Sequence, residues 1–169
     1  MTIREIALVP EPVLRRKARK LTDFGPETQK LIDDMVETMR EAPGVGLAAP
    51  QIAESLQLVV VEFAEDEEDE DAKPKLFVVA NPEIVKRSEE TVTGIEGCLS
   101  IPGLVGDVER NEAVEIKALN RHGKPIKIKA SGWLARIFQH EIDHLDGVLY
   151  TDRATRVWQP REEEEFEDV

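Results

Sequence analysis

Apolar residues recur at helical spacing in the segment that follows Phe24. Leu31, Met35 and Met39 fall on one face of a helix predicted over about residues 26–42. Proline suits the first position of such a helix, and the Pro-Gly pair at 43–44 is a typical stop signal. We therefore predict one long amphipathic helix here, preceded by a short helix within residues 11–18.

A second helical pattern lies near the end of the chain, over about residues 132–146. Leu134, Ile137 and Ile142 contribute to its apolar face. Ser131 is a candidate N-cap, because its hydroxyl can accept from free backbone N–H groups, and Gly147 suits a left-handed C-terminal stop.

Patterns typical of strands occupy the region between the two helices. Runs rich in β-branched residues at 56–63 and 75–82 predict two strands, and one or two more short strands are expected within 83–96. Apolar and polar residues alternate at 113–119 and 125–130, on either side of a glycine-containing turn, which predicts an antiparallel hairpin with one wet face. The order helix, antiparallel strands, helix predicts an α+β fold.

The composition sets the class of protein. Hydrophobic residues make up 41% of the 169-residue chain, which suffices for a core. We find no apolar run of about eighteen residues or more, so no membrane span, and no secretory signal at the N-terminus. We expect a cytoplasmic protein with a single catalytic domain over residues 1–160 and an acidic tail over 161–169.

The negative charge is concentrated in two places. The net charge is -13, but Glu65–Asp71 contains seven consecutive acidic residues and the tail contains six more. These 13 of the 35 acidic residues leave 22, which equals the number of Lys and Arg. We interpret the acidic loop, about residues 65–73, and the tail as solvated, and we expect no direct nucleic-acid partner.

The last predicted helix carries an HExxH pattern. His140 and His144 are four residues apart, so they lie one turn apart on one face, where two imidazoles can bind one cation. Glu141 then projects beside the open position of the metal. The alternative is a pair of ordinary histidines on a polar helix face.

A catalytic metal commonly has three protein ligands and one open position. No histidine follows His144, and His122 lies in a predicted turn and is expected to be exposed. Cys98 is the chain's single cysteine and lies among glycines and a Pro-Gly pair, which permit irregular backbone. A Cys/His/His site is one arrangement that catalytic metals use, whereas a buried structural thiol is the alternative for Cys98.

The segment GVGLAAPQ (residues 44–51) is interpreted as a loop of small residues. Its last residue, Gln51, offers a side-chain amide donor that can stabilise a developing oxyanion near a metal. Tight packing alone is the competing interpretation of this segment.

Three segments, GVGLAAPQ, EGCLS and QHEIDHLDG, resemble in order and spacing the three signature motifs of peptide deformylase. The resemblance runs from about Val9 to near Asp152. It implies an α+β fold of small antiparallel sheets around the C-terminal helix that carries HExxH. It also implies removal of the N-terminal formyl group from formyl-methionine of newly made polypeptides, with release of formate.

The resemblance assigns the metal to Cys98, His140 and His144, and general acid/base catalysis to Glu141. It implies one divalent ion, Fe²⁺ in the cell, which Zn²⁺, Ni²⁺ or Co²⁺ replaces readily. The ligand types alone do not select among these metals.

The resemblance also implies groups that bind the substrate. Gln51 and the backbone N–H of Leu99 are expected to hold the oxyanion. The walls of the methionine pocket are expected to be Val45, Gly46, Trp133 and Ile137, although Trp133 and Ile137 equally suit plain core packing.

Three features depart from the family pattern. Val105 stands where many relatives have an arginine for the peptide backbone, and whether Arg110 replaces it is left open. Arg136 stands at a pocket position that is often apolar, and we expect its stem to line the pocket while its charge reaches water. The acidic tail excludes the basic C-terminal helix with which some relatives dock on the ribosome, so any transient ribosome contact must use another surface.

Three other functions remain open at this point. An HExxH metallopeptidase is disfavoured because the third ligand would be Cys98. A non-catalytic metal-binding scaffold is disfavoured because Glu141 and Gln51 are not needed to hold a structural ion. A hydrolase of another N-acyl group gains support only from Val105.

Overall fold

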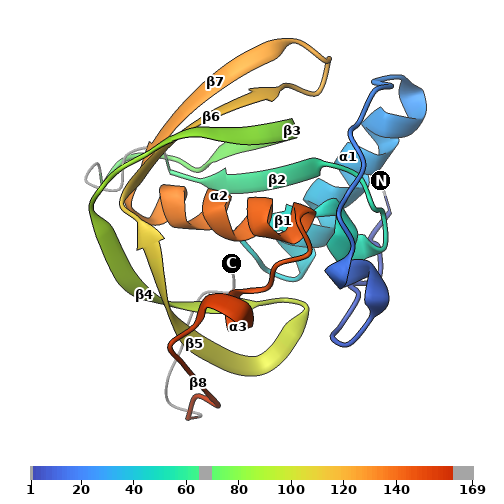
Figure 1. Cartoon of the computed structure of the whole chain (residues 1–169). Helices are drawn as coiled ribbons and strands as arrows, with labels where there is room; N and C mark the ends of the chain where they lie inside the picture. The colour runs from blue at the N-terminus through green and yellow to red at the C-terminus, as the bar shows by residue number, and fades with distance from the viewer. Residues whose placement is uncertain (1, 65–69, 162–169) are drawn as a thin grey trace.

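Helix α2 (Gly132–Leu145) lies between two antiparallel sheets (Figure 1). A computed structural model describes residues 2–64 and 70–161 of the chain. Besides α2, the elements are η1 (Pro12–Arg15), α1 (Pro26–Glu41), β1 (Gly46–Ala48), η2 (Ala49–Ile52), β2 (Leu58–Phe63), β3 (Lys75–Arg87), β4 (Thr91–Cys98), β5 (Ile101–Asn111), β6 (Ala113–Leu119), β7 (Pro125–Ser131), α3 (Tyr150–Arg153) and β8 (Arg156–Trp158). The α+β prediction, with antiparallel sheets packed around the HExxH helix, is confirmed.

The larger sheet has five strands in the order β1-β2-β3-β6-β7, and the smaller sheet has the order β4-β5-β8. The predicted hairpin is confirmed as the β6–β7 pair, with Ile116 opposite Ile128. Strands β4 and β5 form a long hairpin that ends with Cys98 opposite Ile101. This tight end of the hairpin brings Cys98 toward α2.

Strand β2 is buried on both faces, because a helix packs on each side of it. Val59 and Val61 belong to the core that α2 completes, whereas Leu58 and Val60 belong to the core that α1 completes. All four side chains are fully buried. The alternation of side chains along one strand thus joins both helices to the same sheet.

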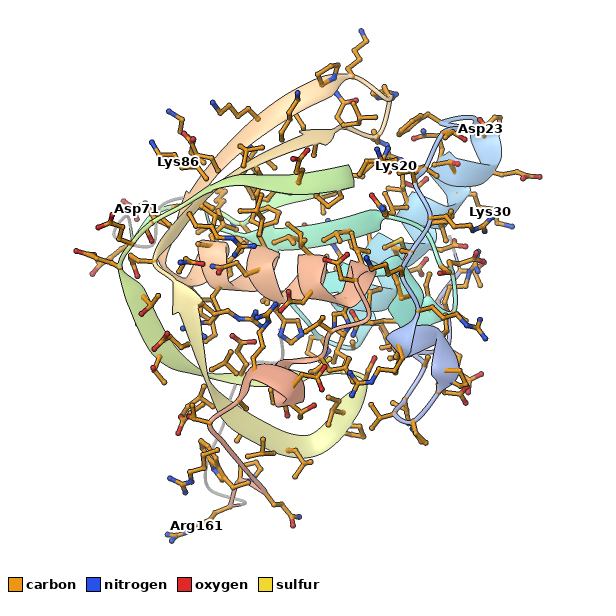
Figure 2. All side chains as sticks on the ribbon, in the orientation of Figure 1. Lys20, Asp23, Lys30, Asp71, Lys86 and Arg161 are labelled. Carbon is orange, nitrogen blue, oxygen red and sulfur yellow. The ribbon has the colours of Figure 1, made fainter. Side chains whose placement is uncertain are left out.

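Helix α1 matches the predicted helix closely and buries Leu31, Met35 and Met39 as predicted. Charged side chains such as Lys20, Lys30 and Lys86 lie at the periphery, as Figure 2 shows. No helix among residues 2–64 and 70–161 is long and apolar enough to cross a membrane.

Several local predictions need correction. Residues 46–48 form strand β1 and not a loop, because Leu47 and Ala48 are buried against the cores on either side and pair with β2. Strand β3 continues past Pro82 to residue 87, since irregular pairing after Ala80 accommodates the proline. Strands β5 and β8 were not predicted, because glycine and proline obscure the pattern of β5 and β8 has only three residues.

The N-terminus of α2 is also built differently from the prediction. Ser131 is the N-cap residue, but its side chain makes no capping hydrogen bond. The first backbone N–H, from Gly132, instead donates to Glu112 O at 2.9 Å. Gly147 has φ 73°, as predicted for a left-handed stop. Residues 65–69 of the predicted acidic loop and 162–169 of the tail lie outside the described residues.

Candidate metal centre and active site

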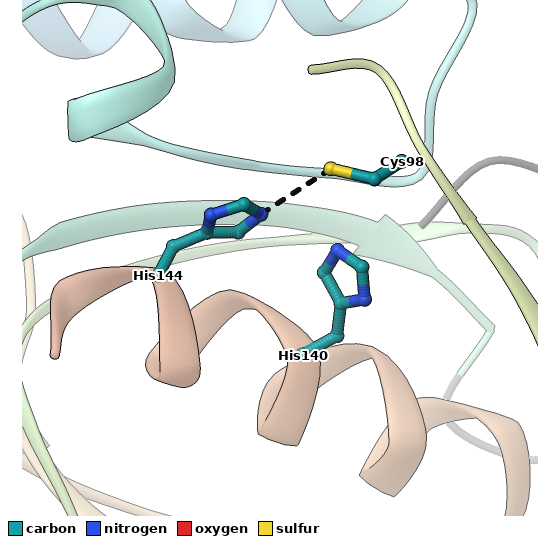
Figure 3. A group of neighbouring side chains, drawn as sticks. All are labelled: Cys98, His140 and His144. Carbon is teal, nitrogen blue, oxygen red and sulfur yellow. Dashed lines mark hydrogen bonds between the residues drawn. The ribbon is translucent and has the colours of Figure 1, made fainter. Parts of the chain in front are cut away.

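The structure brings Cys98, His140 and His144 together between the β4–β5 turn and α2 (Figure 3). One ligand atom from each residue lies within 4.8 Å of the other two, and Cys98 Sγ is 3.5 Å from His144 Nε2. All three side chains are buried. His122, which was expected to be exposed in a turn, is exposed between β6 and β7.

The two imidazole rings present buried nitrogen atoms to this centre. His140 Nδ1 lies 2.8 Å from Glu96 Oε1, and because a carboxylate accepts, Nδ1 carries the hydrogen of that bond. His140 Nε2 is buried and has no hydrogen-bond partner among the described residues, and on His144 it is Nε2 that faces the Cys98 sulfur. A thiolate and two imidazoles are a donor set that suits Zn²⁺ or Fe²⁺, so these residues fit a catalytic divalent metal.

Glu141 is fully buried beside this group, and neither carboxylate oxygen has a hydrogen-bond partner among the described residues. A Cβ atom added at Gly46 would lie 2.6 Å from Glu141 Oε2, so only glycine lets strand β1 approach the carboxylate this closely. Burial raises the pKa of Glu141 to about 7. A carboxyl group with that pKa can both take and give a proton near neutral pH.

Gln51 is fully buried on η2 and has a fixed orientation. Its Oε1 accepts from the Ala48 N–H at 3.0 Å. Its Nε2 donates to Ser100 Oγ at 3.2 Å and lies 3.6 Å from Cys98 Sγ. The amide donor is therefore directed at the centre, next to the thiol.

Glu96 was not predicted as a site residue, yet its carboxylate contacts His140 and two arginines. Arg110 donates to both of its oxygens at 2.9 Å, and Arg136 donates to Oε2 at 2.7 Å. Glu96 is fully buried, and both arginines are at least 95% buried. Glu96 lies two residues before the candidate ligand Cys98, and this position is the sequence feature that could have identified it.

Electrostatics at this centre favour positive charge on one histidine. Burial alone would raise the pKa of Glu96, but hydrogen bonds with Arg110 and His140 outweigh it and hold this pKa well below its usual value. Burial alone would lower the pKa of His140, but the neighbouring Cys98 side chain and the hydrogen bond to Glu96 outweigh it and raise this pKa to about 10. Burial keeps the pKa of His144 well below its usual value. A metal cation binds only the neutral imidazole, so it would have to displace the proton of His140.

The expectation for Arg136 is wrong. Its guanidinium does not reach water but is buried against the β4–β5 hairpin, where it donates to Val92 O at 2.6 Å and Val108 O at 2.8 Å. Partners in the interior are available because Glu96 and two strand carbonyls face it. Arg110, in turn, is bound to Glu96 and to Asp143 at 2.7 Å, so it does not replace the missing arginine at buried Val105.

Of the residues predicted to bind the substrate, Gly46 approaches Glu141, whereas Val45, Trp133 and Ile137 lie in or against the hydrophobic core. Gly46 and Ile137 are buried, and Val45 and Trp133 are partly buried against the core between α2 and the sheet. Leu99 follows Cys98 directly and is partly buried. A separate groove of about 350 Å³ is lined by the ends of β3, β6 and β7, and none of these residues belongs to it.

Comparison with known proteins is consistent with this geometry. The family model for polypeptide deformylase matches residues 3–159. A peptide deformylase from Symbiobacterium thermophilum is 54% identical over all of this chain and 76% of its own length, and peptide deformylase 1 from Bacillus subtilis is 45% identical over 94% of both proteins. The crystal structure of peptide deformylase from Thermus thermophilus has a TM-score of 0.81 and 46% identity, over 90% of this chain and 86% of that one. The chain therefore belongs to the peptide deformylase family, metal-dependent hydrolases that remove the formyl group from formyl-methionine of nascent polypeptides.

Proposed function

We propose that Cys98, His140 and His144 hold the metal ion on which this deformylase activity depends. The observation that supports it best is that three buried donor atoms lie within 4.8 Å of one another. His140 Nε2 has no hydrogen-bond partner among the described residues, which leaves it available for a metal.

We propose Fe²⁺ as the metal in the cell, with Zn²⁺, Ni²⁺ or Co²⁺ as replacements. One thiolate and two imidazoles suit each of these ions, so cellular availability decides among them. Once bound, such an ion supplies a Lewis acid and lowers the pKa of a water molecule toward neutrality.

Glu141 is proposed as the general acid/base. It takes a proton from the attacking water and returns it to the leaving amine, so it serves both halves of the reaction. Its burial and its pKa of about 7 support both roles. Gly46 contributes by leaving space for the carboxylate on the β1 side.

The Gln51 amide and the Leu99 N–H are proposed to stabilise the negative charge that develops on the formyl oxygen. Gln51 needs no rearrangement for this role, because Ala48 and Ser100 already hold its side chain in place. A preorganised donor of this kind contributes about 3 kcal/mol to barrier lowering.

The substrate side of the site is proposed from the residues around the ligands. Val45, Gly46, Trp133 and Ile137 are the candidates for the apolar pocket of the methionine side chain. A formyl carbon carries only hydrogen, so a tight centre excludes larger acyl groups by shape. With Val105 buried and apolar, the peptide backbone must be bound by other groups.

The biological setting follows from the substrate. Formyl-methionyl nascent chains emerge from ribosomes, so we propose a cytoplasmic enzyme that contacts the ribosome transiently, without a basic C-terminal helix. We also propose that residues 1–160 form the catalytic domain and 161–169 a separate acidic tail. A non-catalytic scaffold, or activity on another N-acyl group, gains no support from the relatives cited above, which are named as peptide deformylases.

The test is formate release from formyl-Met-Ala-Ser by anaerobically purified protein, with metal content measured in parallel. We expect release by the wild type, loss after chelation, and recovery with Fe²⁺ or Co²⁺. Gln51→Ala should keep its metal and lose about 10²- to 10³-fold in kcat. No release by the metal-loaded wild type would contradict the proposed roles.

A further inference from the structure

The side chain of Arg136 joins α2 to both strands of the β4–β5 hairpin. Its Nη1 donates to Glu96 Oε2 on β4 at 2.7 Å and to Val108 O on β5 at 2.8 Å. Its Nη2 donates to Val92 O on β4 at 2.6 Å. Arg136 is 4% exposed, so these bonds form in the interior, where their geometry is well defined.

The candidate metal centre lies across the same junction. Its two histidines come from α2, and its cysteine comes from the end of the β4–β5 hairpin. The distance from the Cys98 sulfur to the histidine nitrogens therefore depends on how the hairpin sits on the helix. Among the described residues, Arg136 is the α2 side chain that hydrogen-bonds to backbone carbonyls on both β4 and β5.

We propose that Arg136 is a positioning residue, which clamps the β4–β5 hairpin to α2 and so sets the position of Cys98 relative to His140 and His144. This inference rests on the metal site proposed above. It assigns Arg136 a role in the geometry of that site and not in contact with substrate.

Charge neutralisation of Glu96 is not the main contribution of Arg136. Arg110 already pairs with both oxygens of Glu96, and it reaches Asp143 of α2 at 2.7 Å. Loss of Arg136 therefore leaves Glu96 paired with one guanidinium and with His140. What is lost is the link to the carbonyls of Val92 and Val108.

Gly94 provides an independent observation. A Cβ atom added there would lie 2.9 Å from Arg136 Cζ and 3.0 Å from Nε and Nη2. The guanidinium thus packs directly on the backbone of β4, in space that only glycine leaves open. Gly94→Ala should push the guanidinium away from the hairpin without removing its charge.

The first experiment is Co²⁺ binding to full-length Arg136→Met, Arg136→Lys and Gly94→Ala. Lysine keeps the charge but lacks the planar fork whose two terminal nitrogens reach the carbonyls of Val92 and Val108. We expect Co²⁺ affinity to fall about 10- to 100-fold, with a weaker cobalt–thiolate absorption band. Arg153→Met is the matched control, because Arg153 pairs only with Asp143 in this network and is half-exposed. Its Co²⁺ affinity should stay within about twofold of wild type.

The second experiment is hydrogen exchange of the metal-free proteins. If Arg136 acts as a clamp, amides of residues 94–100 should exchange faster in Arg136→Lys and Gly94→Ala, while those of α1 should not change. A residue that stabilised only the whole fold would accelerate both regions together.

The proposal is overturned if folded variants keep wild-type Co²⁺ affinity and spectrum, or if exchange accelerates uniformly. Should Arg136→Met fail to fold, the lysine and Gly94→Ala variants decide. A wild type that binds no Co²⁺ through a thiolate would overturn the metal site itself, and the exchange data would still decide the clamp.

Discussion

Helices α1 and α2 pack on opposite faces of the same sheet, but they bury different side chains. Helix α1 buries Asp34 and Thr38 as its polar residues, and both accept hydrogen bonds from the N-terminal segment. Helix α2 buries five polar or charged side chains, which are Arg136, Gln139, His140, Glu141 and His144. Similar amphipathic patterns thus produce a helix that serves stability and a helix that serves chemistry.

The difference lies in what satisfies the buried polar groups. On α1 the buried residues Asp34 and Thr38 have partners in the N-terminal segment, as in the pair of Arg4 with Asp34 at 3.0 Å, and Glu37 Oε2 is the α1 atom without a partner among the described residues. On α2 the atoms that lack a partner among the described residues include His140 Nε2 and both oxygens of Glu141. Unpaired buried polar atoms cost stability, so their concentration at one centre indicates function.

The largest effect should follow Glu141→Gln on α2. Because one carboxylate serves both proton transfers, we expect kcat for formate release to fall about 10⁴-fold. The free energy of unfolding of the metal-free protein should not fall, since a buried carboxylate without a partner is replaced by a neutral amide. Steady-state kinetics and urea unfolding measure the two quantities. Retained activity at full metal loading would refute the role of Glu141.

The converse change is Met35→Ala on α1. Met35 is fully buried among Ile32, Met39 and Leu58, so its truncation should lower the free energy of unfolding by about 2–5 kcal/mol. The kcat per folded molecule should remain within about twofold of wild type, because Met35 lies in the core on the α1 side of the sheet. A selective loss of kcat without loss of stability would contradict the assignment of α1 to stability and of α2 to catalysis.

The raised pKa of His140 on α2 predicts that stability depends on pH. His140 has a folded pKa of about 10 against a usual value of 6.5. A raised pKa contributes stability that is fully present below about pH 6.5 and is lost as the pH rises toward 10. The free energy of unfolding of the metal-free protein should therefore decrease from pH 7 to 9, by up to about 1.4 kcal/mol per pH unit.

Urea unfolding at a series of pH values measures this slope. Glu96→Gln is the matched variant, because it weakens one of the hydrogen-bond partners that raise the pKa of His140. We expect a flatter slope in that variant, whatever its overall stability. Equal slopes in both proteins would contradict the assignment.

The smallest effect should follow deletion of residues 65–71. We expect the rate on short formyl-peptides to be nearly unchanged, because the strands that flank this segment pair directly, with Phe63 opposite Lys75. Kinetics on formyl-Met-Ala-Ser check this, with circular dichroism as the control for folding. A large loss of activity in a folded protein would give the acidic loop a role in catalysis.

Some features were readable from residue order alone. The 3.6-residue period predicted both long helices, and the alternating period predicted the β6–β7 hairpin, because these patterns arise from local backbone geometry. The HExxH spacing placed His140 and His144 on one helix face for the same reason. Cys98 and Gln51, which are far from α2 in sequence, were candidates from their residue types and their loops, and the resemblance to a known family then assigned their roles.

Other features depended on contacts between distant segments, and only the tertiary structure decided them. Arg136 looks like a solvent-reaching residue in sequence, but the hairpin surrounds it with three acceptors. Glu96 looks like one acid among many, but two arginines and His140 converge on it. Local periodicity carries no information on which long-range partner satisfies a buried charge. Residue order therefore determined the helices and the HExxH motif. Packing between the β4–β5 hairpin and α2 decided the environment of the candidate metal centre.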